Sequence, residues 1–372
     1  MTSKYLCGAA LAFALTIGGS GASAKPGDKI QGSYICVFKA GAVARANVRS
    51  EAGRAAGNGV NHVYSNSIRG FSASAASAAA LQSHNPNIAY CEQDQEVDAI
   101  QSGPLDFRVV GRPAPPPPSQ STPWGVARVH GGAGTGSGSG TAWVIDTGID
   151  LDHPDLNVDS GRSRSFIRDS SPDDGNGHGS HVAGIIGAKD NSIGVIGVSP
   201  GATLVAVRVL DRNGRGANSD VIAGVDYVAA NGHSGDVANM SLGGGVSTAL
   251  DNAVVAAAAT GVKFTLAAGN ESDSATNHSP ARANGPNVYT VSAFGQGDKW
   301  ASYSNFGNPP VDYAEPGSSI PSTYKSGGYA TLSGTSMAAP HLAGILLTRS
   351  SPANGGTVSG DPDGNPDTIG TK

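Results

Sequence analysis

A serine lies within a run of small residues, SGTSMAAPH over residues 333–341, and could act as a nucleophile. An apolar run over residues 342–347 follows, so the pattern predicts a tight turn that leads into a buried helix. A serine on such a turn can hold its hydroxyl in a cleft, while backbone N–H groups at the helix start bind negative charge. The alternative is that Ser336 only caps the helix, which an isolated Gly-Thr-Ser sequence favours. Other polar residues of the chain must decide between the two.

Three further polar residues stand where strands are expected to end or helices to begin. Asp146 directly follows an apolar strand pattern, and a carboxylate there can orient a histidine such as His178. Asn270 ends another strand pattern, where its amide can donate to an oxyanion. His178 and His181 lack the spacing and the glutamate of the H-E-x-x-H zinc motif, which argues against a metal at this pair.

The elements that would position these residues alternate between strands and helices. Two helical patterns, residues 219–230 behind a serine cap and residues 249–260, separate apolar runs that indicate strands buried on both faces. The strand patterns cover residues 141–145, 204–210, 237–240, 262–268 and 288–293. This alternation predicts an α/β fold with a parallel sheet flanked by helices on both faces, and a site at the carboxyl ends of the strands.

Four motifs in this chain order, VIDTG, HGSHVAG, AAGN and GTSMAAPH, resemble those of the subtilisin-like serine proteases, of the proteinase K and bacterial subtilisin types. The resemblance covers residues 119–347. It implies that Ser336 is the nucleophile and that His178 is the general base and then the acid. Asp146 would orient His178, and Asn270 would form the oxyanion hole together with the backbone N–H of Ser336.

The same resemblance implies that exposed backbone binds the substrate as an added antiparallel strand, which favours extended polypeptides. The implied substrate-binding residues are Gly214, Arg215, Gly216, Ser241, Leu242, Gly243, Ala267, Ala268 and Gly269. Leu242 and residues 267–269 would line an apolar pocket for the residue before the cut. Arg215 would either favour acidic side chains nearby or be a solvated loop charge.

Residues 189–195 resemble the calcium loop of subtilisins. The implied ligands are the side chains of Gln120, Asp155 and Asn191 and the carbonyls of Lys189, Ile193 and Val195. Oxygen donors from three distant segments suit a hard cation, so we expect structural calcium there. The acidic segment 361–367 lacks the glycine and the closing glutamate of a calcium loop, so we expect a solvated turn.

The N-terminal part of the chain predicts a secreted precursor. Lys4, an apolar run and Ala22-Ser23-Ala24 indicate a signal peptide over residues 1–24. Residues 30–100 have the patterns of a small α+β domain and resemble the ferredoxin-like inhibitory propeptide of the family, in which residues 95–101 would lie in the active site as a product-like strand. A separate domain of unrelated role is the alternative.

Cysteine use fits an oxidising compartment. Cys7 lies in the predicted signal, so Cys36 and Cys91 are the remaining candidates for a disulfide, and their pairing is left open. The expected division of the chain is a signal peptide (1–24), an inhibitory propeptide (25–101), a proline-rich linker (102–120), a subtilisin-like catalytic domain (121–350) and a polar tail (351–372).

Composition limits the partners. The 372 residues include 54 glycines and 14% charged residues, which fits a large globular core with many tight turns. The net charge of −5 without a basic cluster argues against nucleic acid. After the signal no apolar stretch reaches about 18 residues, so we expect a secreted monomer that does not enter a membrane.

Together these features predict a secreted serine endopeptidase that is made as a self-processing precursor. The chain would cut itself between about Asp98 and Ser121, with polypeptides as substrates and its own propeptide as intramolecular inhibitor. The alternative is a catalytically silent binding protein on the same scaffold. An α/β-hydrolase esterase is disfavoured, because its acid and histidine follow the serine in the chain and here only His341 does.

Overall fold

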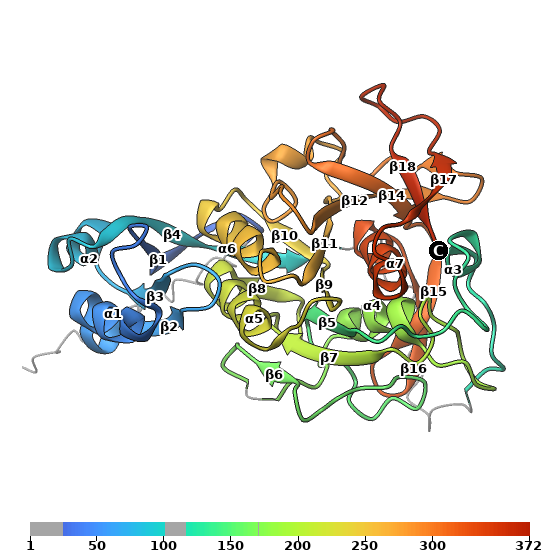
Figure 1. Ribbon diagram of the computed structural model, residues 1–372, viewed down its shortest axis with the longest axis horizontal. Helices are drawn as coiled ribbons and strands as arrows, with labels where there is room; N and C mark the ends of the chain where they lie inside the picture. The colour runs from blue at the N-terminus through green and yellow to red at the C-terminus, as the bar shows by residue number, and fades with distance from the viewer. Residues whose placement is uncertain (1–24, 101–116, 170) are drawn as a thin grey trace, which may run out of the picture.

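The structure, a computed structural model, describes residues 25–100, 117–169 and 171–372. The predicted signal peptide and most of the predicted linker lie outside these residues. Figure 1 shows a small α+β unit on the left, residues 29–99, joined along one side to a larger α/β unit.

The large unit is built on a mixed sheet whose described strands follow the order β17-β18-β14-β12-β11-β9-β5-β7-β6, with β13 paired to β12. Each strand from β18 to β6 in this order runs parallel to the next one. β17 and β13 pair antiparallel with β18 and β12. Their bounds are β5 (Thr141–Asp146), β6 (Arg164–Ser165), β7 (Thr203–Arg208), β9 (Val237–Met240), β11 (Lys263–Ala267), β12 (Val288–Gly295), β13 (Lys299–Trp300), β14 (Val311–Pro316), β17 (Ala353–Thr357) and β18 (Thr368–Thr371). The predicted α/β fold is confirmed.

Helices cover both faces of this sheet. α4 (His178–Gly187) and α7 (Thr335–Thr348) share one buried cluster, and α5 (Asn218–Asn231) and α6 (Thr248–Ala258) share a second. Along β5, Val144 packs into the first cluster and Ile145 into the second, because successive side chains of a strand point to opposite faces. Burial on both faces explains the unbroken apolar runs of these strands.

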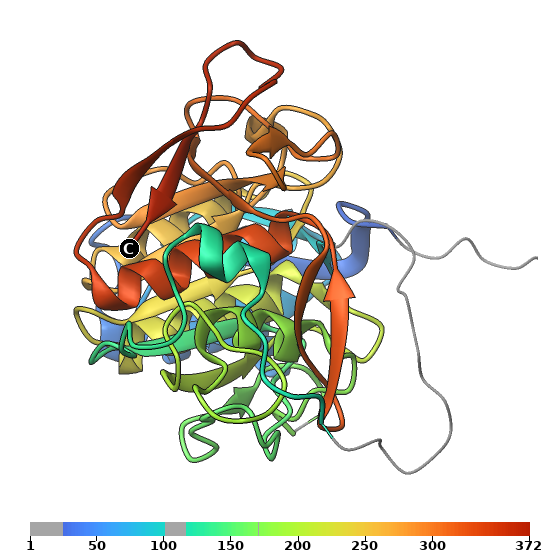
Figure 2. The same ribbon diagram turned by 90° about the vertical axis from the view of Figure 1, so that its right-hand side faces the viewer.

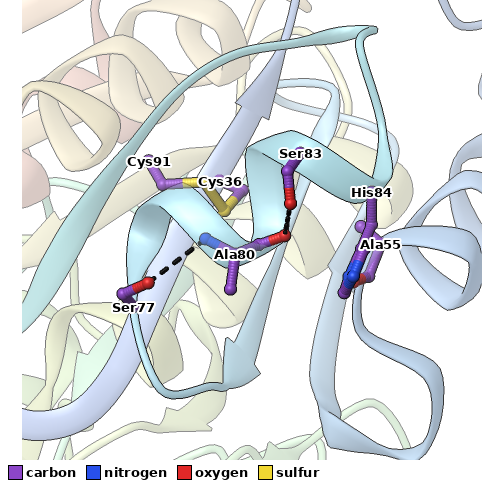
Figure 3. Close-up of a disulfide and its surroundings, with 7 residues drawn as sticks. All are labelled: Cys36, Ala55, Ser77, Ala80, Ser83, His84 and Cys91. Atoms are coloured by element: carbon purple, nitrogen blue, oxygen red, sulfur yellow. Dashed lines mark hydrogen bonds between the residues drawn. A yellow bond between two sulfur atoms is a disulfide. The ribbon is translucent and has the colours of Figure 1, made fainter.

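The small unit has the element order βαββαβ: β1 (Lys29–Phe38), α1 (Val48–Ala56), β2 (Val60–Tyr64), β3 (Gly70–Ser74), α2 (Ala78–His84) and β4 (Ile88–Ala99). Its strands pair antiparallel in the order β4-β1-β3-β2. Cys36 and Cys91 are direct cross-strand partners with Cα atoms 4.0 Å apart, and a disulfide joins them. Figure 3 shows this bond beside α2, whose first turn is capped by Ser77 at the N–H of Ala80.

Short elements complete the fold. They are α3 (Trp124–Arg128), β8 (Arg215–Ala217), β10 (Leu242–Gly244), the hairpin β15 (Ile320–Tyr324) and β16 (Gly328–Leu332), and single turns at Arg45–Asn47, Gly57–Gly59 and Ala275–Asn277. Within the described ranges, every helix is too short or too polar to cross a bilayer.

The C-terminal segment differs from the polar tail that we expected for residues 351–372. β18 joins the main sheet through Ala314 and Ile369, and Figure 2 shows β17 and β18 beside α7. Ile369 and Val358 are buried against Phe294. The expectation was wrong because two isolated apolar residues in a Gly/Pro-rich sequence give no strand periodicity, although they are enough to anchor a hairpin. Only the tip, around residues 361–366, is the expected exposed turn.

Candidate active site

Asp146 and His178 meet at the carboxyl edge of the sheet. Asp146 is the last residue of β5 and His178 is the first of α4, and both side chains are buried. The His178 Nδ1 lies 2.8 Å from Asp146 Oδ1, which also accepts from the N–H of Thr147 at 2.7 Å. Burial of the ring lowers the pKa of His178, but the Asp146 carboxylate outweighs it and the pKa is raised overall. This geometry fixes the tautomer that leaves Nε2 as a proton acceptor.

The start of α4 is held by a carboxylate that the sequence analysis did not select. Asp174 accepts from the N–H of Gly177 at 2.8 Å and from the N–H and hydroxyl of Ser180 at 2.9 and 2.7 Å. At Gly179 an added Cβ would lie 2.0 Å from the carbonyl oxygen of Gly148, so only glycine lets α4 approach β5 this closely. An acidic residue just before a helix start is the signal that could have identified Asp174.

Ser336 is the second residue of α7 and is fully buried in this structure. Its hydroxyl donates to the carbonyl of Ser241 at 3.0 Å. The His178 Nε2 is buried and has no hydrogen-bond partner among the described residues. The structure therefore holds the Ser336 hydroxyl on Ser241 and does not join it to His178.

Asn270 is oriented by Thr335. The Asn270 Oδ1 accepts from the N–H of Thr335 at 2.9 Å and from its hydroxyl at 3.0 Å. The Asn270 Nδ2 is buried without a partner in the described part of the chain. An amide whose oxygen is fixed in this way offers its N–H₂ to a negative oxygen that forms beside Ser336. Thr335 is a second positioning residue that the sequence analysis missed.

The end of β4 lies in the groove between β8 and β10. Antiparallel pairing joins Val97 to Gly244 on one side and to Gly216 on the other, so β4 forms the middle strand of three. Figure 1 shows β4 leaving the small unit and reaching β8 and β10 of the large one. This arrangement is that of a peptide added to a sheet edge.

Ile100, directly after β4, brings the chain to the candidate catalytic residues. Its N–H donates to the carbonyl of Ser241 at 3.2 Å, the same carbonyl that holds the Ser336 hydroxyl. The carbonyl of Ile100 is close enough to His178 to raise the pKa of the ring. The side chain packs against the cluster that contains Ala267, and an added Cβ on Gly243 would lie 2.8 Å from its Cδ1.

The other predicted substrate-binding residues surround this strand or the end of β11. The Gly214 carbonyl accepts from the N–H of Ala99 at 2.8 Å, and Leu242 pairs with Ala99 in register. Ala268 is buried directly after β11, and Gly269 has a φ of 109° and donates to the Thr335 hydroxyl at 3.1 Å.

Comparison with known proteins agrees with this arrangement. The model of the Subtilase family matches residues 142–357. This chain belongs to the subtilase family. Subtilisin BL of Lederbergia lenta is 46% identical over 233 residues, which cover 61% of this chain and 83% of that protein. A solved structure described as a cold adapted subtilisin-like serine proteinase matches with a TM-score of 0.58 and 40% identity, covering 66% of this chain and 96% of that one.

Two further relatives are matched over a smaller share of their own length. Alkaline serine exoprotease A of Vibrio alginolyticus is 42% identical over 300 residues, which cover 77% of this chain and 52% of that protein. M-protease of Shouchella clausii (strain KSM-K16) is 41% identical over 268 residues, which cover 70% of this chain and 63% of that protein. The chain thus spans about half to two thirds of the length of these two relatives.

Two carboxylates of β4 meet the N-termini of the helices that face the small unit of this subtilase. Asp94 accepts from the N–H of Ser219 at 3.1 Å, and Glu92 accepts from the N–H of Ala249 at 3.3 Å and from the Ser247 hydroxyl. The predicted serine cap of α5 is therefore wrong, because Asp94 takes that place while Ser247 does cap α6. A carboxylate at a helix N-terminus is favoured by the helix dipole.

The remaining buried histidines near α4 and α7 are neutral. Burial lowers the pKa of His181 to about 3 and that of His341 to about 4. His181 Nε2 lies 3.0 Å from the carbonyl of Ile320, and His341 Nδ1 lies 2.8 Å from that of Met337. Within residues 25–100, 117–169 and 171–372, no three histidine, cysteine or acidic side chains gather as a metal site.

The predicted calcium ligands gather around Asp155. The Asp155 carboxylate is fully buried, and its partners are the Asn191 Nδ2 at 2.8 Å, the N–H of Val195 at 3.2 Å and the Tyr329 hydroxyl at 3.2 Å. The Gln120 Oε1 accepts from the N–H of Asn191. These partners are neutral, and the ligands that the resemblance implies are carboxylate, amide and backbone carbonyl oxygens, a set of atoms that fits calcium. Binding requires the Asn191 amide to turn its oxygen toward Asp155.

Proposed function

We propose that this chain is the precursor of a secreted serine endopeptidase. Residues 25–100 act as an intramolecular inhibitor of the catalytic domain that begins near residue 121, and residues 1–24 direct secretion. The observation that carries the proposal is the position of Ile100, whose N–H donates to the same Ser241 carbonyl that accepts the Ser336 hydroxyl. The precursor cuts itself at the peptide bond after Ile100.

The reaction begins when the Ser336 hydroxyl leaves the Ser241 carbonyl and its oxygen attacks the substrate carbonyl carbon. The His178 Nε2 takes the hydroxyl proton, and Asp146 keeps the ring in this orientation and stabilises the imidazolium. The carbonyl oxygen becomes negative, and the Asn270 Nδ2 and the Ser336 N–H donate to it.

Collapse of this intermediate breaks the C–N bond. The His178 imidazolium gives its proton to the departing amine, which leaves an acyl ester on Ser336. Water then attacks the ester, His178 removes one proton from the water, and the same sequence releases the acid and restores the Ser336 hydroxyl. A carboxylic acid and an amine are the products.

Substrate selection follows from the strand pairing. An extended polypeptide replaces β4 between β8 and β10, with main-chain hydrogen bonds to the Gly214 and Ser241 carbonyls. The residue before the cut occupies the apolar site that Ile100 fills. Asp155, Asn191 and Gln120 would hold calcium, which would compensate the charge of the buried Asp155 carboxylate. The enzyme works as a monomer, because the site is complete within one chain.

The test is expression of the full precursor and of its Ser336→Ala variant. We expect the active chain to yield a new N-terminus directly after Ile100 and the variant to stay full length. A fluorophosphonate probe should label the processed protein at Ser336. If both chains stay intact and no label is found, the protein is a silent binding scaffold and the proposal is wrong.

A further inference from the structure

We infer that Arg215 selects substrates with an acidic residue third before the cut bond. This inference rests on the proposed function, because it takes β4 as a copy of the bound substrate. With Ile100 first before the cut, Asp98 is third, and it pairs in register with Arg215 of β8. Side chains directly opposite each other in an antiparallel pair lie on the same face, with Cβ atoms about 5 Å apart.

The pairing on the other side of Asp98 leaves Arg215 as the side chain opposite it in register. On the β10 side Asp98 pairs with Gly243, which has no side chain. Val97 and Ala99 alternate with Asp98 along β4, so their side chains point to the opposite face. Val97 is fully buried, whereas Asp98 and Arg215 are half-buried. The side chain that faces the third substrate residue before the cut therefore comes from β8.

The charges near Asp98 favour an acid. Burial raises the pKa of Asp98 overall, while Arg215 lowers it and Asp211 raises it by less than Arg215 lowers it. The Asp98 Oδ1 is buried without a hydrogen-bond partner among the described residues. Asp211 already accepts from the N–H of Arg215 at 3.0 Å and from that of Asn213 at 2.7 Å, so its carboxylate is held within its own loop. Of these two charged neighbours, Arg215 has the larger effect on Asp98.

A second acid of the same strand supports the assignment. Glu96 is two residues from Asp98 and lies on the same face, diagonal to Arg215. Burial and the neighbouring Asp98 raise the pKa of Glu96, and Arg215 lowers it by a smaller amount. The segment that the chain supplies to its own groove thus carries acids at the third and fifth positions before Ile100. Both acids are opposite in charge to Arg215 on β8.

The test uses the self-processed enzyme and three fluorogenic peptides that end in Gln-Val-x-Ala-Ile before the reporter, with x as Asp, Asn or Lys. For partly exposed pairs we expect kcat/KM to fall about threefold from Asp to Asn and about tenfold from Asp to Lys. About 1 M salt should shrink both ratios, because the Debye length falls to about 3 Å. In Arg215→Gln the ratios should approach one, and in Arg215→Glu the Lys peptide should become the best substrate.

Arg212→Gln is the matched control, since Arg212 lies in the loop before β8 and outside the strand pairing, and it should keep the wild-type ratios.

Within the precursor, Asp98→Lys should slow self-processing more than Asp98→Asn, and Arg215→Glu should restore the rate of Asp98→Lys. This charge exchange tests the pair even if one single variant folds poorly. Equal cleavage of the Asp and Lys peptides by the wild type, or ratios that survive in Arg215→Gln, would overturn the inference but not the endopeptidase. Failure to cleave any of the peptides, without fluorophosphonate labelling, would overturn both.

Discussion

The Ser241 hydroxyl donates to the carbonyl of Ser336 at 2.9 Å, where an α-helix would normally supply the N–H four residues later. That residue is Pro340, which has no N–H. α7 begins at Thr335, so Pro340 is its sixth residue and lies beyond the first turn. Ser241 therefore binds the nucleophile twice, through its hydroxyl to the Ser336 carbonyl and through its carbonyl to the Ser336 hydroxyl.

Removal of the Ser241 hydroxyl should leave the buried Ser336 carbonyl without a partner. We expect Ser241→Ala to lower the free energy of unfolding by about 1–3 kcal/mol. In a Pro340→Ala background the helix N–H returns, so the cost of Ser241→Ala should shrink by about 1 kcal/mol. Denaturant unfolding of the four chains, each carrying Ser336→Ala to prevent self-digestion, measures this coupling. An equal cost of Ser241→Ala in both backgrounds would show that the two residues act independently.

Thr335 should act on the reaction through Asn270. Asn270→Ala removes the donor itself, and we expect kcat to fall about 10²- to 10³-fold, the loss known for this donor in the relative subtilisin. Thr335→Val removes the hydroxyl bond to the Asn270 Oδ1 but keeps the N–H bond, so kcat should fall about tenfold with KM little changed. Thr331→Val on the exposed face of β16 is the control. A change confined to KM would show that Thr335 affects substrate binding and not the stabilisation of the oxyanion by Asn270.

The pH profile should report the raised pKa of His178. The base must be neutral, so kcat/KM should rise with pH through a pKa above the usual value of about 6.5. Asp146→Asn removes the carboxylate that raises this pKa, so the acid limb should move to lower pH. Turnover should also fall about 10⁴-fold, as the equivalent loss does in subtilisin. If the acid limb of the kcat/KM profile has the same pKa in Asp146→Asn, the limb reports a group other than His178.

The sequence predicted the large sheet well because burial on both faces leaves unbroken apolar runs, as at residues 141–145 and 262–268. It also placed Asp146 at the end of a strand and His178 at the start of a helix, where the structure has them, whereas Asn270 lies three residues beyond the end of β11. It could not predict contacts made by long-range packing. The hydrogen bonds of Thr335 to Asn270 and of Asp174 to Gly177 and Ser180 depend on how the backbone turns at these positions, which leaves no periodic pattern in the sequence. Within the small unit, the sequence does not predict α1 or β2. α1 has few large apolar residues and contains Gly53, and β2 has only five residues, with Asn61 and His62 between its apolar positions.

The carboxylate of Asp94 should slow the release of the small unit after self-processing. Asp94 accepts from Ser219 at the start of α5 and from the Ser33 hydroxyl at 3.0 Å. Loss of such a cap costs about 1 kcal/mol, so Asp94→Ala should shorten the lag before full activity about fivefold. Asp94→Asn keeps an oxygen acceptor, so its lag should lie between those of the wild type and Asp94→Ala. Glu51→Gln, on α1 of the same unit, is the control for charge, and a lag shortened equally by Glu51→Gln would point to general destabilisation.

Calcium should stabilise the protein through Asp155. At about 100 times the dissociation constant, an ion that binds only the folded state adds about 2.7 kcal/mol, which corresponds to a rise in Tm of about 5–10 °C. Melting of the Ser336→Ala precursor with calcium and with excess chelator measures this shift. Asp155→Asn should abolish it, because the buried carboxylate supplies the formal charge among the proposed ligands. Asp363→Asn, in the exposed turn after β17, should keep the full shift. A shift that survives in Asp155→Asn but disappears in Asp363→Asn would place the ion at that turn.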